Sequence, residues 1–305
     1  EQEALDFLNQ NIEAQFYIDS LEKRPATKAP AAPFTTSTLQ QEASRKLGFS
    51  VSRTMQNAQR LYEDGLITYM RTDSVNLSKQ ALAQAASVIE SNYGKQYLRT
   101  HQYVTKKKGA QEAHEAIRPT DLNLMEANVE YDQQRLYDLI LKRTLASQMS
   151  LAKLERTVAK IVTDKHPHAF VARGEVVVFD GFLKLYFEGI DDPSDEDQAL
   201  LPAMKKGEVA HAKRIIGTQR FSRPPYRYSE ASLVKKLEEL GIGRPSTYAP
   251  TISTVLNRKY VAKGTYEGDQ RIYKQLQLND NKLTTENKFE KTGSQKGKLV
   301  PTDIG

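Results

Sequence analysis

The pattern of apolar residues predicts a pair of helices in the first quarter of the chain. A helix over 52–65 carries apolar side chains at helical spacing: Met55, Ala58, Leu61 and Tyr62. The preceding helix is expected to begin at Ser37 or Thr38, each with a glutamine three residues later, and to end at Gly48. Two helices joined by a short glycine turn resemble a helix-turn-helix, and residues 66–70 are expected to follow as a strand.

A second segment repeats this order of elements. Ser229 can cap a helix with apolar residues on one face: Leu233, Val234, Leu237 and Leu240. A glycine turn at 241–243 leads to a helix over 247–259, and strand-like Tyr260 and Val261 follow. Helix–turn–helix–strand is also common in compact proteins, so the repeat alone leaves open whether the two units share a function.

The remaining patterns predict a β-rich region within a mixed fold. Helices are expected over 3–10 and 130–149, and a strand over 12–20. The segment 23–33, with three prolines and four alanines, is expected to be a linker or an extended crossing segment. Further strands are expected over 154–163, 169–179, 182–188 and 208–216. The lysine-rich stretch 279–297 is expected to be an exposed hairpin or loop. The patterns predict a multidomain α+β fold, with helix-turn-helix-like units and a β-rich region between them.

Composition narrows the class of protein. The 305 residues carry a formal net charge of +6, which suits a polyanionic partner but also an ordinary solvated surface. The chain has no cysteine, which excludes disulfides, thiolate zinc sites and cysteine nucleophiles. No apolar run approaches the ~20 residues that span a membrane, and no signal peptide is visible. We therefore expect a soluble, cytoplasmic protein.

Two groups of residues could be considered as metal ligands, but the sequence favours neither as a metal site. The segment 188–197 holds six carboxylates around a proline, in a polar run with no apolar frame to fix ligand geometry. A solvated loop is the preferred interpretation. His166 and His168 lie in a turn setting without a third ligand and are interpreted as surface residues.

The run from Tyr69 to Ser74 offers chemistry for phosphate transfer. On a strand, Tyr69 and Arg71 would point to the same face, so a guanidinium could clamp the phosphate that a tyrosine attacks. A phenol ionises only near pH ~10, so a nucleophilic tyrosine needs positive charge or a proton acceptor nearby. Thr72 and Ser74 could donate to phosphate, and Asp73 could steer Arg71. From Tyr69 and Arg71 alone, the preferred interpretation is the end of a strand with ordinary polar residues.

His114 and Arg118 form a second constellation. Four residues apart, they share a face if the turn is helical. His114 could bind a phosphate or protonate a leaving oxygen. The zinc-protease pattern His-Glu-x-x-His fails because position 118 is arginine.

Five ordered blocks then carry a family resemblance. They are FTTSTLQQ at 34–41, GLITYMRTDS at 65–74, EAHEAIRPT at 112–120, YSEASLV at 228–234 and GIGRPSTYA at 241–249. Together they resemble bacterial DNA topoisomerase I, of the type IA class, from about residue 11 to the C-terminus. Met70, where topoisomerase III usually has proline, and the run 115–118 favour topoisomerase I. Reverse gyrase shares much of this core.

The resemblance implies a mechanism. The matching tyrosine, Tyr69, would attack one DNA strand and become linked to the 5′ phosphate. Arg71 would stabilise the scissile phosphate, and His114 would contact the backbone in the same cleft. The link conserves the phosphodiester energy, so relaxation of negatively supercoiled DNA needs no ATP. Consistent with this, residues 293–299 lack the P-loop spacing and its final hydroxyl.

The resemblance also implies an architecture, an incomplete form of the type IA torus. A β-rich arch of 1–28 and 156–216 would hinge a gate, and a mostly helical domain, 29–155, would carry the tyrosine. A helical, winged-helix-like domain, 217–305, would form a groove for single-stranded DNA.

Phosphates of the single strand would meet the candidate DNA-binding residues. In the groove domain these are Arg244, Ser246, Thr247 and Arg258, with Arg118, Thr72, Asp73 and Ser74 near the tyrosine. The alternative for Arg244 is a salt bridge at the end of a helix. Residues 213–229 add Lys213, Arg214, Arg220, Arg223 and Arg227, with no acid among them.

One part of the family pattern is missing. The family binds Mg²⁺ on an acidic N-terminal domain of the Toprim type, and nothing before Phe34 resembles it. We therefore expect this chain not to relax DNA alone. The expected partner is single-stranded or negatively supercoiled DNA. We expect the protein to be a monomer associated with the nucleoid and not to bind a membrane. The alternatives are a non-enzymatic single-strand DNA-binding module and a tyrosine recombinase or type IB enzyme. The position of Tyr69 near the start argues against the last.

Overall fold

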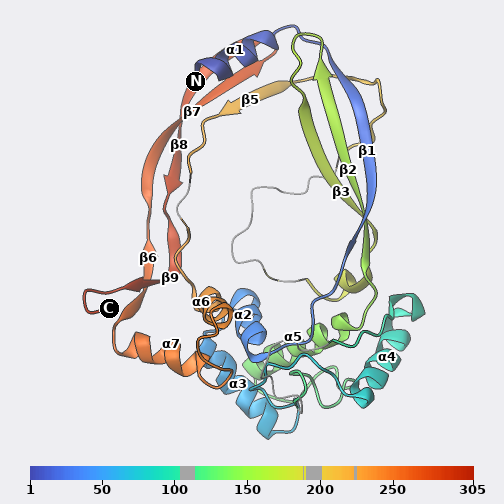
Figure 1. Cartoon of the computed structure of the whole chain (residues 1–305), viewed down its shortest axis with the longest axis vertical. Helices are drawn as coiled ribbons and strands as arrows, with labels where there is room; N and C mark the ends of the chain where they lie inside the picture. The colour runs from blue at the N-terminus through green and yellow to red at the C-terminus, as the bar shows by residue number, and fades with distance from the viewer. Residues whose placement is uncertain (104–113, 188, 190–200, 223–224) are drawn as a thin grey trace.

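The molecule is elongated, with a helical base and two columns of strands. The computed structural model describes residues 1–103, 114–187, 189, 201–222 and 225–305. Figure 1 shows most helices gathered at one end, while the strands run away from them in two columns. The columns meet at the far end, beside α1 (Gln2–Gln10). The α+β class predicted from the sequence is confirmed, and the division into three domains stays a prediction.

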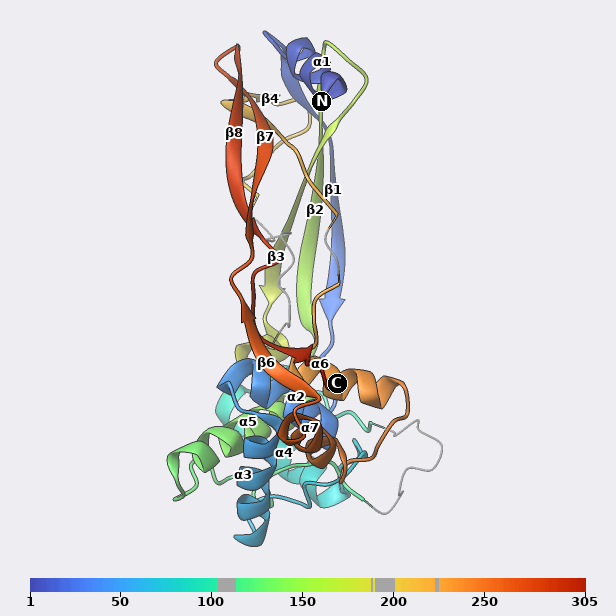
Figure 2. The same cartoon turned by 90° about the vertical axis from the view of Figure 1, so that its left-hand side faces the viewer.

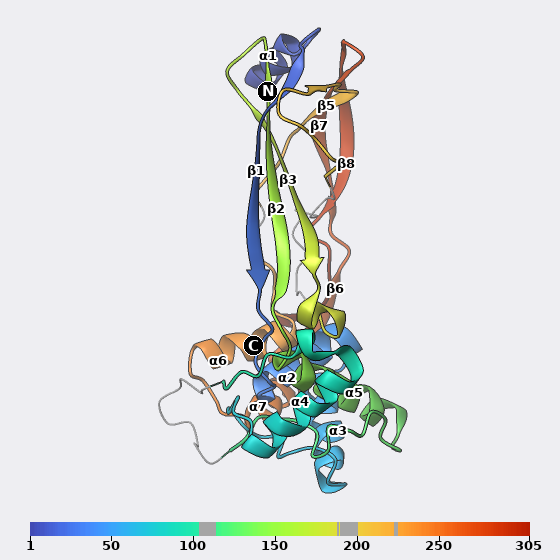
Figure 3. The ribbon, with the colours of Figure 1, turned by 90° about the vertical axis from the view of Figure 1, so that its right-hand side faces the viewer.

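The first column is an antiparallel sheet in the order β3-β2-β1-β4 (Figure 3). Its strands are β1 (Phe16–Lys28), β2 (Ala152–Thr163), β3 (Phe170–Phe179) and β4 (Val209–Ala210). Of the two interpretations of 23–33, the linker is wrong for its first part, because β1 stays extended and paired with β2 as far as Lys28. Pro25 lies where β1 is an edge strand, because β4 pairs only with the first two residues of β1, and edge strands tolerate proline.

The second column contains two smaller sheets (Figure 2). One joins β5 (Arg214–Thr218), β7 (Asp269–Asn279) and β8 (Lys282–Thr292), and the other pairs β6 (Val261–Tyr266) with β9 (Gln295–Pro301). The predicted hairpin in the lysine-rich stretch is confirmed, as the turn from β7 into β8. Leu8 of α1 is buried with Leu276 and Leu278 of β7, and this contact joins the columns at their far end.

The helical base has one large apolar core. It is built from α2 (Thr36–Leu47), α3 (Val51–Glu63), α4 (Lys79–Tyr93) and α5 (Tyr131–Ser147), with a short 3-10 turn, η1 (Lys95–Tyr97). Phe34, Leu39, Leu61 and Tyr137 are buried together in it. The predicted helices begin earlier than expected, because Thr35 caps α2 in a capping box with Thr38 and Ser50 caps α3. Helix α4 was not predicted.

The second helix pair packs on the first. It consists of α6 (Glu230–Glu239), capped by Ser229 as predicted, and α7 (Tyr248–Asn257). Val51 of α3 is buried in one cluster with Val234, Tyr248 and Ile252. Two segments far apart in the sequence therefore share a small core.

Two predicted strands are absent from the described residues. The segment expected as a strand over 182–188 begins as a 3-10 turn, η2 (Gly181–Lys184), because Phe182 and Tyr186 turn into the core of the base. The segment 66–70 makes only an isolated bridge from Ile67 to Pro119. Within the described part of the chain, no helix has the length and apolar character to cross a bilayer.

Gly181 gives a test of this core. Its φ is +52°, and an added Cβ would collide with the carbonyl oxygen of Ser150 and lie 2.6 Å from that of Leu151. We expect Gly181→Ala to lower the free energy of unfolding by about 2–4 kcal/mol, from strain and steric overlap together. Gly48→Ala is the control, since its φ is +69° but nothing lies within 4 Å of the added Cβ. It should cost only about 1 kcal/mol. Equal losses in urea unfolding would contradict the packing described.

Candidate active site

Tyr69 lies on an exposed bend between two ordered segments. The bend is held where Thr68 N donates to Arg118 O at 2.8 Å and Thr120 N donates to Leu66 O at 3.0 Å. These bonds bring His114 beside Tyr69, with ring centroids 6.3 Å apart and edge-on geometry. The Tyr69 side chain is 42% exposed. Among the described residues its hydroxyl has no hydrogen-bond partner, so it is open to a ligand.

Burial alternates along the chain from Tyr69 to Ser74. Tyr69 and Arg71 are exposed, whereas Met70, Thr72 and Ser74 are buried. This is the period of an extended chain, although no partner strand is found beside it among the described residues. The expected strand is therefore wrong, but Tyr69 and Arg71 do share the outward face.

The hydroxyls of Thr72 and Ser74 are engaged inside the protein. Thr72 Oγ1 accepts from Ser74 N at 3.0 Å, and Ser74 Oγ accepts from Asn76 N at 3.2 Å. Thr36 Oγ1 donates to Met70 O at 2.7 Å and accepts from Thr72 N at 2.9 Å. These bonds fix the path of the segment, so both side chains serve the loop in this structure. Their contact with DNA stays a prediction and, because both residues are buried, would require the segment to open.

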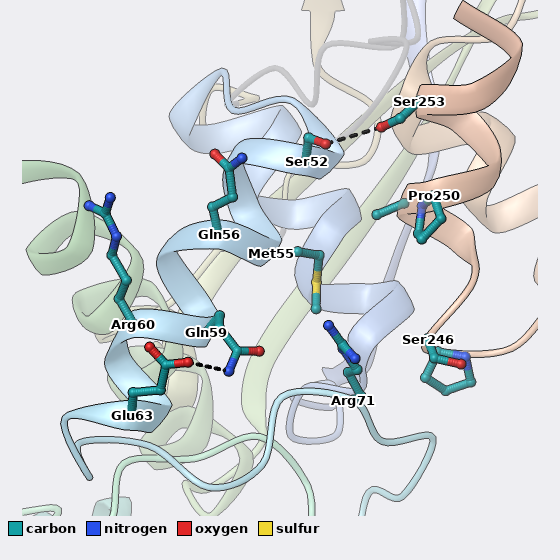
Figure 4. Close-up of a pocket in the computed structure, with 12 residues that line it drawn as sticks. Ser52, Met55, Gln56, Gln59, Arg60, Glu63, Arg71, Ser246, Pro250 and Ser253 are labelled. Carbon is teal, nitrogen blue, oxygen red and sulfur yellow. Dashed lines mark hydrogen bonds between the residues drawn. The ribbon is translucent and has the colours of Figure 1, made fainter. Parts of the chain in front are cut away.

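Arg71 opens onto a pocket between α3 and α7 (Figure 4). The pocket has a volume of about 590 Å³. Helix α3 and Arg71 form one wall, and Ser246 with the first turns of α7 forms the other. Ser52 Oγ and Ser253 Oγ, 3.1 Å apart, close one side. No hydrogen bond or ion pair to Arg71 is found within the described ranges, so its guanidinium is available to an anion.

Asp73 does not hold Arg71, since no bond between them is found in the described part of the chain. It lies instead near Tyr248 on α7. Burial raises the pKa of Tyr248, and the negative charges of Glu238 and Asp73 raise it further, with Arg244 opposing them.

Arg118 is tied to its neighbours. Its guanidinium pairs with Glu115 at 2.6 Å and donates to Pro119 O at 2.9 Å, and only 13% of its side chain is exposed. Glu115 also accepts from Ser78 N at the start of α4, at 2.5 Å. The structure thus joins Arg118 to the loop that carries His114, and its DNA contact stays a prediction.

The groove candidates lie around α7. Arg244 is exposed, and its N–H donates to Thr247 Oγ1 at 2.8 Å just before the helix begins. No ion pair to Arg244 is found among the described residues, so the predicted alternative of a helix-end salt bridge is not seen there. Ser246 lines the pocket with Arg71, while Arg258 lies at the opposite end of α7.

Other sequence candidates lie elsewhere. Of the basic run 213–229, Arg227 stacks on Tyr266 at 5.2 Å, and Arg223 lies outside the described residues. His166 packs on Phe7 near α1, with centroids 4.8 Å apart. The acidic loop 188–197 lies outside the described residues except for Gly189, and no group of three or more metal ligands is found in the remainder that is described.

Several residues at the site were missed by the sequence analysis. Tyr62, assigned to the apolar face of its helix, lies exposed beside Tyr69 with ring centroids 5.3 Å apart. Gln59 and Glu63 line the pocket with Met55. Gln59 and Glu63 are four residues apart, so they lie on the same face of α3, and this spacing could have predicted that they act together.

Comparisons with known proteins agree on one family. A family model described as DNA topoisomerase matches residues 1–279. The DNA topoisomerase 1 of Rickettsia prowazekii is 48% identical over 277 residues, covering 86% of this chain and 36% of the relative. A DNA topoisomerase 1 of prokaryotic type from Acanthamoeba polyphaga mimivirus is 44% identical, covering 99% of this chain and 38% of the relative. The chain thus spans little more than a third of these two relatives.

A solved structure shows the same fold. Full-length topoisomerase I from Thermotoga maritima superimposes with a TM-score of 0.71 at 36% sequence identity. The match covers 87% of this chain and 44% of that chain.

Glu115 predicts a pH dependence of stability. Burial acts to raise its pKa, but the hydrogen bonds from Ser78 and Arg118 outweigh burial and hold the pKa below its ordinary value of 4.5. Ionised Glu115 therefore stabilises the fold above pH 4.5, and this contribution is lost as the pH falls through the lowered pKa.

We expect Glu115→Gln to lower the melting temperature by about 2–4 °C at pH 7. The difference from the wild type should shrink below the ordinary carboxyl pKa. Glu90→Gln, at an exposed position on α4, is the control and should change little at either pH. An effect of Glu115→Gln that is constant from pH 7 to acid would contradict the assignment.

Proposed function

Because the chain belongs to the DNA topoisomerase family, we propose that it carries the tyrosine nucleophile of a type IA enzyme. The complete protein would relax negatively supercoiled DNA without ATP, by breaking one strand transiently and passing another through the break. The observation that carries the proposal is the exposed Tyr69 ring beside His114, on the same outward face as Arg71, whose guanidinium has no partner among the described residues.

The residues supply a balanced cleavage step. The phenol oxygen of Tyr69 attacks the phosphorus, and its proton passes to solvent water, which reaches the exposed hydroxyl. The O3′ of the preceding nucleotide leaves and takes a proton, for which His114 is the nearby donor. One phosphorus–oxygen bond forms and one breaks, so the 5′-phosphotyrosine keeps the energy needed for resealing. Arg71 stabilises the charge on the phosphate oxygens.

None of the roles proposed for the residues of this chain uses magnesium. The family resemblance places it on an acidic domain, where it would neutralise phosphate charge. The described residues offer no three carboxylates or histidines that would hold it. The residues present here therefore account for nucleophile, phosphate clamp and proton donor only.

A non-enzymatic single-strand binding module is the second candidate function. It is supported by the basic, aromatic surface where Arg227 stacks on Tyr266 and Lys298 on Tyr226. It shares the binding of DNA with the first proposal but requires no covalent step. The two are separated by whether a covalent adduct forms.

Binding to single strands tests the phosphate clamp. We expect Arg71→Ala to weaken binding of a single-stranded oligonucleotide about tenfold, the value of a charged hydrogen bond. The slope of log K against log salt should fall by about 0.7, as for one lost phosphate contact. Arg99→Ala, at an exposed arginine outside the pocket, is the control. Fluorescence anisotropy measures both affinities. Equal affinities for Arg71→Ala and the wild type would contradict the contact of Arg71 with phosphate.

Adduct formation tests the nucleophile. The chain would be joined to an acidic Toprim domain of a relative and incubated with single-stranded DNA and Mg²⁺. We expect a denaturant-stable protein–DNA adduct that Tyr69→Phe abolishes. Tyr62→Phe is the matched control, because Tyr62 is the exposed neighbour of Tyr69 and should remain dispensable. An adduct that survives Tyr69→Phe would show that the nucleophile is another residue.

A further inference from the structure

The two helix pairs meet at the base without a chain segment that joins them there. At the far end of the molecule, the chain passes directly from β4 in the first column to β5 in the second. At the base, the pair α2 and α3 lies against the pair α6 and α7 (Figure 1). The chain between the two pairs runs through α4, α5 and strands of both columns. The pairs can therefore separate by breaking non-covalent contacts, without unfolding either column.

Glu230 joins the two pairs through a buried carboxylate. It is the first residue of α6, and only 8% of its side chain is exposed. One carboxylate oxygen accepts from Val51 N, at the first residue of α3, at 2.7 Å. The other oxygen pairs with Lys263 Nζ of β6 at 2.5 Å. We call these two bonds the Glu230 contact.

The Glu230 contact lies where positive charges converge. Val51 begins α3 and Glu230 begins α6, so the N-termini of two helices meet at this point. A helix N-terminus is positive because its first N–H groups have no partner within the helix. Lys263 adds a full positive charge from the side of the second pair. Without the carboxylate, the N-terminus of α3 would be repelled by the N-terminus of α6 and by Lys263.

Each helix also has a cap that does not depend on this contact. Ser50 Oγ accepts from Arg53 N at 3.1 Å within the first pair. Ser229 Oγ accepts from Ser232 N at 3.1 Å within the second. When the pairs separate, both helices keep these local caps, while Val51 N and the carboxylate gain water as their partner. The Glu230 contact can therefore break and form again without fraying of either helix.

The neighbouring contacts also suit reversible separation. The apolar cluster between the pairs is small, and its buried members are Val51, Val234, Tyr248 and Ile252. Ser52 Oγ and Ser253 Oγ lie 3.1 Å apart across the interface (Figure 4). A small apolar area costs little to expose, and hydroxyls can exchange each other for water. One charged contact can therefore decide between the closed and the separated arrangement.

We propose that the Glu230 contact controls the separation of the two helix pairs, the movement that lets a second strand pass. This inference rests on the proposed function, in which the cut strand is attached to Tyr69 on the side of the first pair. Passage through the break requires that side to move away from α7, which forms the opposite wall of the pocket. Glu230 touches no reacting atom, so it is a positioning residue that sets how often the pairs separate.

Hydrogen exchange of the Val51 amide reports this separation. As the first residue of α3, Val51 has no acceptor within its own helix, and it is 1% exposed. Its N–H bonds to Glu230 instead, so it reaches solvent when the pairs separate. We expect Glu230→Ala to speed the exchange about tenfold or more, the value of a hydrogen bond to a charged group. Glu230→Gln, which keeps an acceptor but loses the charge, should give an intermediate rate. NMR spectroscopy of this chain measures the exchange.

Two controls distinguish separation from local fraying. Glu239→Gln, at an exposed carboxylate of the same helix, should leave the exchange of Val51 unchanged. The amide of Thr54, which donates to Ser50 O at 2.9 Å at the start of α3, should keep its rate in every variant. Faster exchange at Thr54 as well as Val51 would show that α3 frays, and would overturn the proposal.

A disulfide across the interface tests whether separation is the cause. The chain has no cysteine, so Ser52→Cys with Ser253→Cys places a single pair where two hydroxyls lie 3.1 Å apart. Oxidation should hold the helix pairs together and return the Val51 exchange of Glu230→Ala to the wild-type rate or below it. Reduction should restore the fast exchange.

Each outcome decides a separate claim. Exchange of Val51 that neither Glu230 variant changes overturns the role of Glu230. Fast exchange that persists in the oxidised pair overturns separation as its cause. These measurements contain no DNA, so either result leaves the proposed function standing. An adduct that forms without Tyr69 would instead overturn the proposed function and leave the exchange result as it is.

Discussion

The contact between the two helix pairs is the constraint on which the site depends. Glu230 of α6 is buried, and its carboxylate accepts from Val51 N, at the start of α3, at 2.7 Å. Lys263 pairs with the same carboxylate at 2.5 Å. A negative charge at a helix N-terminus is favourable because unpaired N–H groups and the helix dipole meet there. With the apolar cluster around Val234, this contact sets α7 against α3 and so creates the pocket that Arg71 and Ser246 share.

A second support fixes the segment that bears Tyr69, the proposed nucleophile. Thr36, fully buried at the start of α2, bonds to Met70 and Thr72 on either side of Arg71. With Met70 and Thr72 turned inward, Tyr69 and Arg71 are held facing outward before any ligand arrives. Preorganised donors cost little reorganisation when charge develops, which is what phosphate transfer requires. The fold thus uses buried hydroxyls to position exposed reactive groups.

Local signals predicted the helices well, and long-range contacts explain the failures. The capped, amphipathic segments α3 and α6 follow from spacing within one helix. The extension of β1 to Lys28 depends on β2, whose residues lie more than a hundred positions away. The pocket depends on α3 and α7, where Ser52 and Ser253 are 201 positions apart. Tyr69, Arg71 and His114 were predicted together because family motifs connect them. Gln59 and Tyr62 belong to no such motif and emerged only from the packing.

The identity of the nucleophile is the central claim, and the structure offers one close rival. Tyr62 is exposed like Tyr69, and the two rings lie 5.3 Å apart. The most direct measurement is tandem mass spectrometry of the peptide that carries DNA, after an adduct formed with an acidic domain and Mg²⁺ is trapped and digested. The account predicts a nucleotide attached through its 5′ phosphate to Tyr69. A nucleotide on Tyr62, or one attached through a 3′ phosphate, would contradict it.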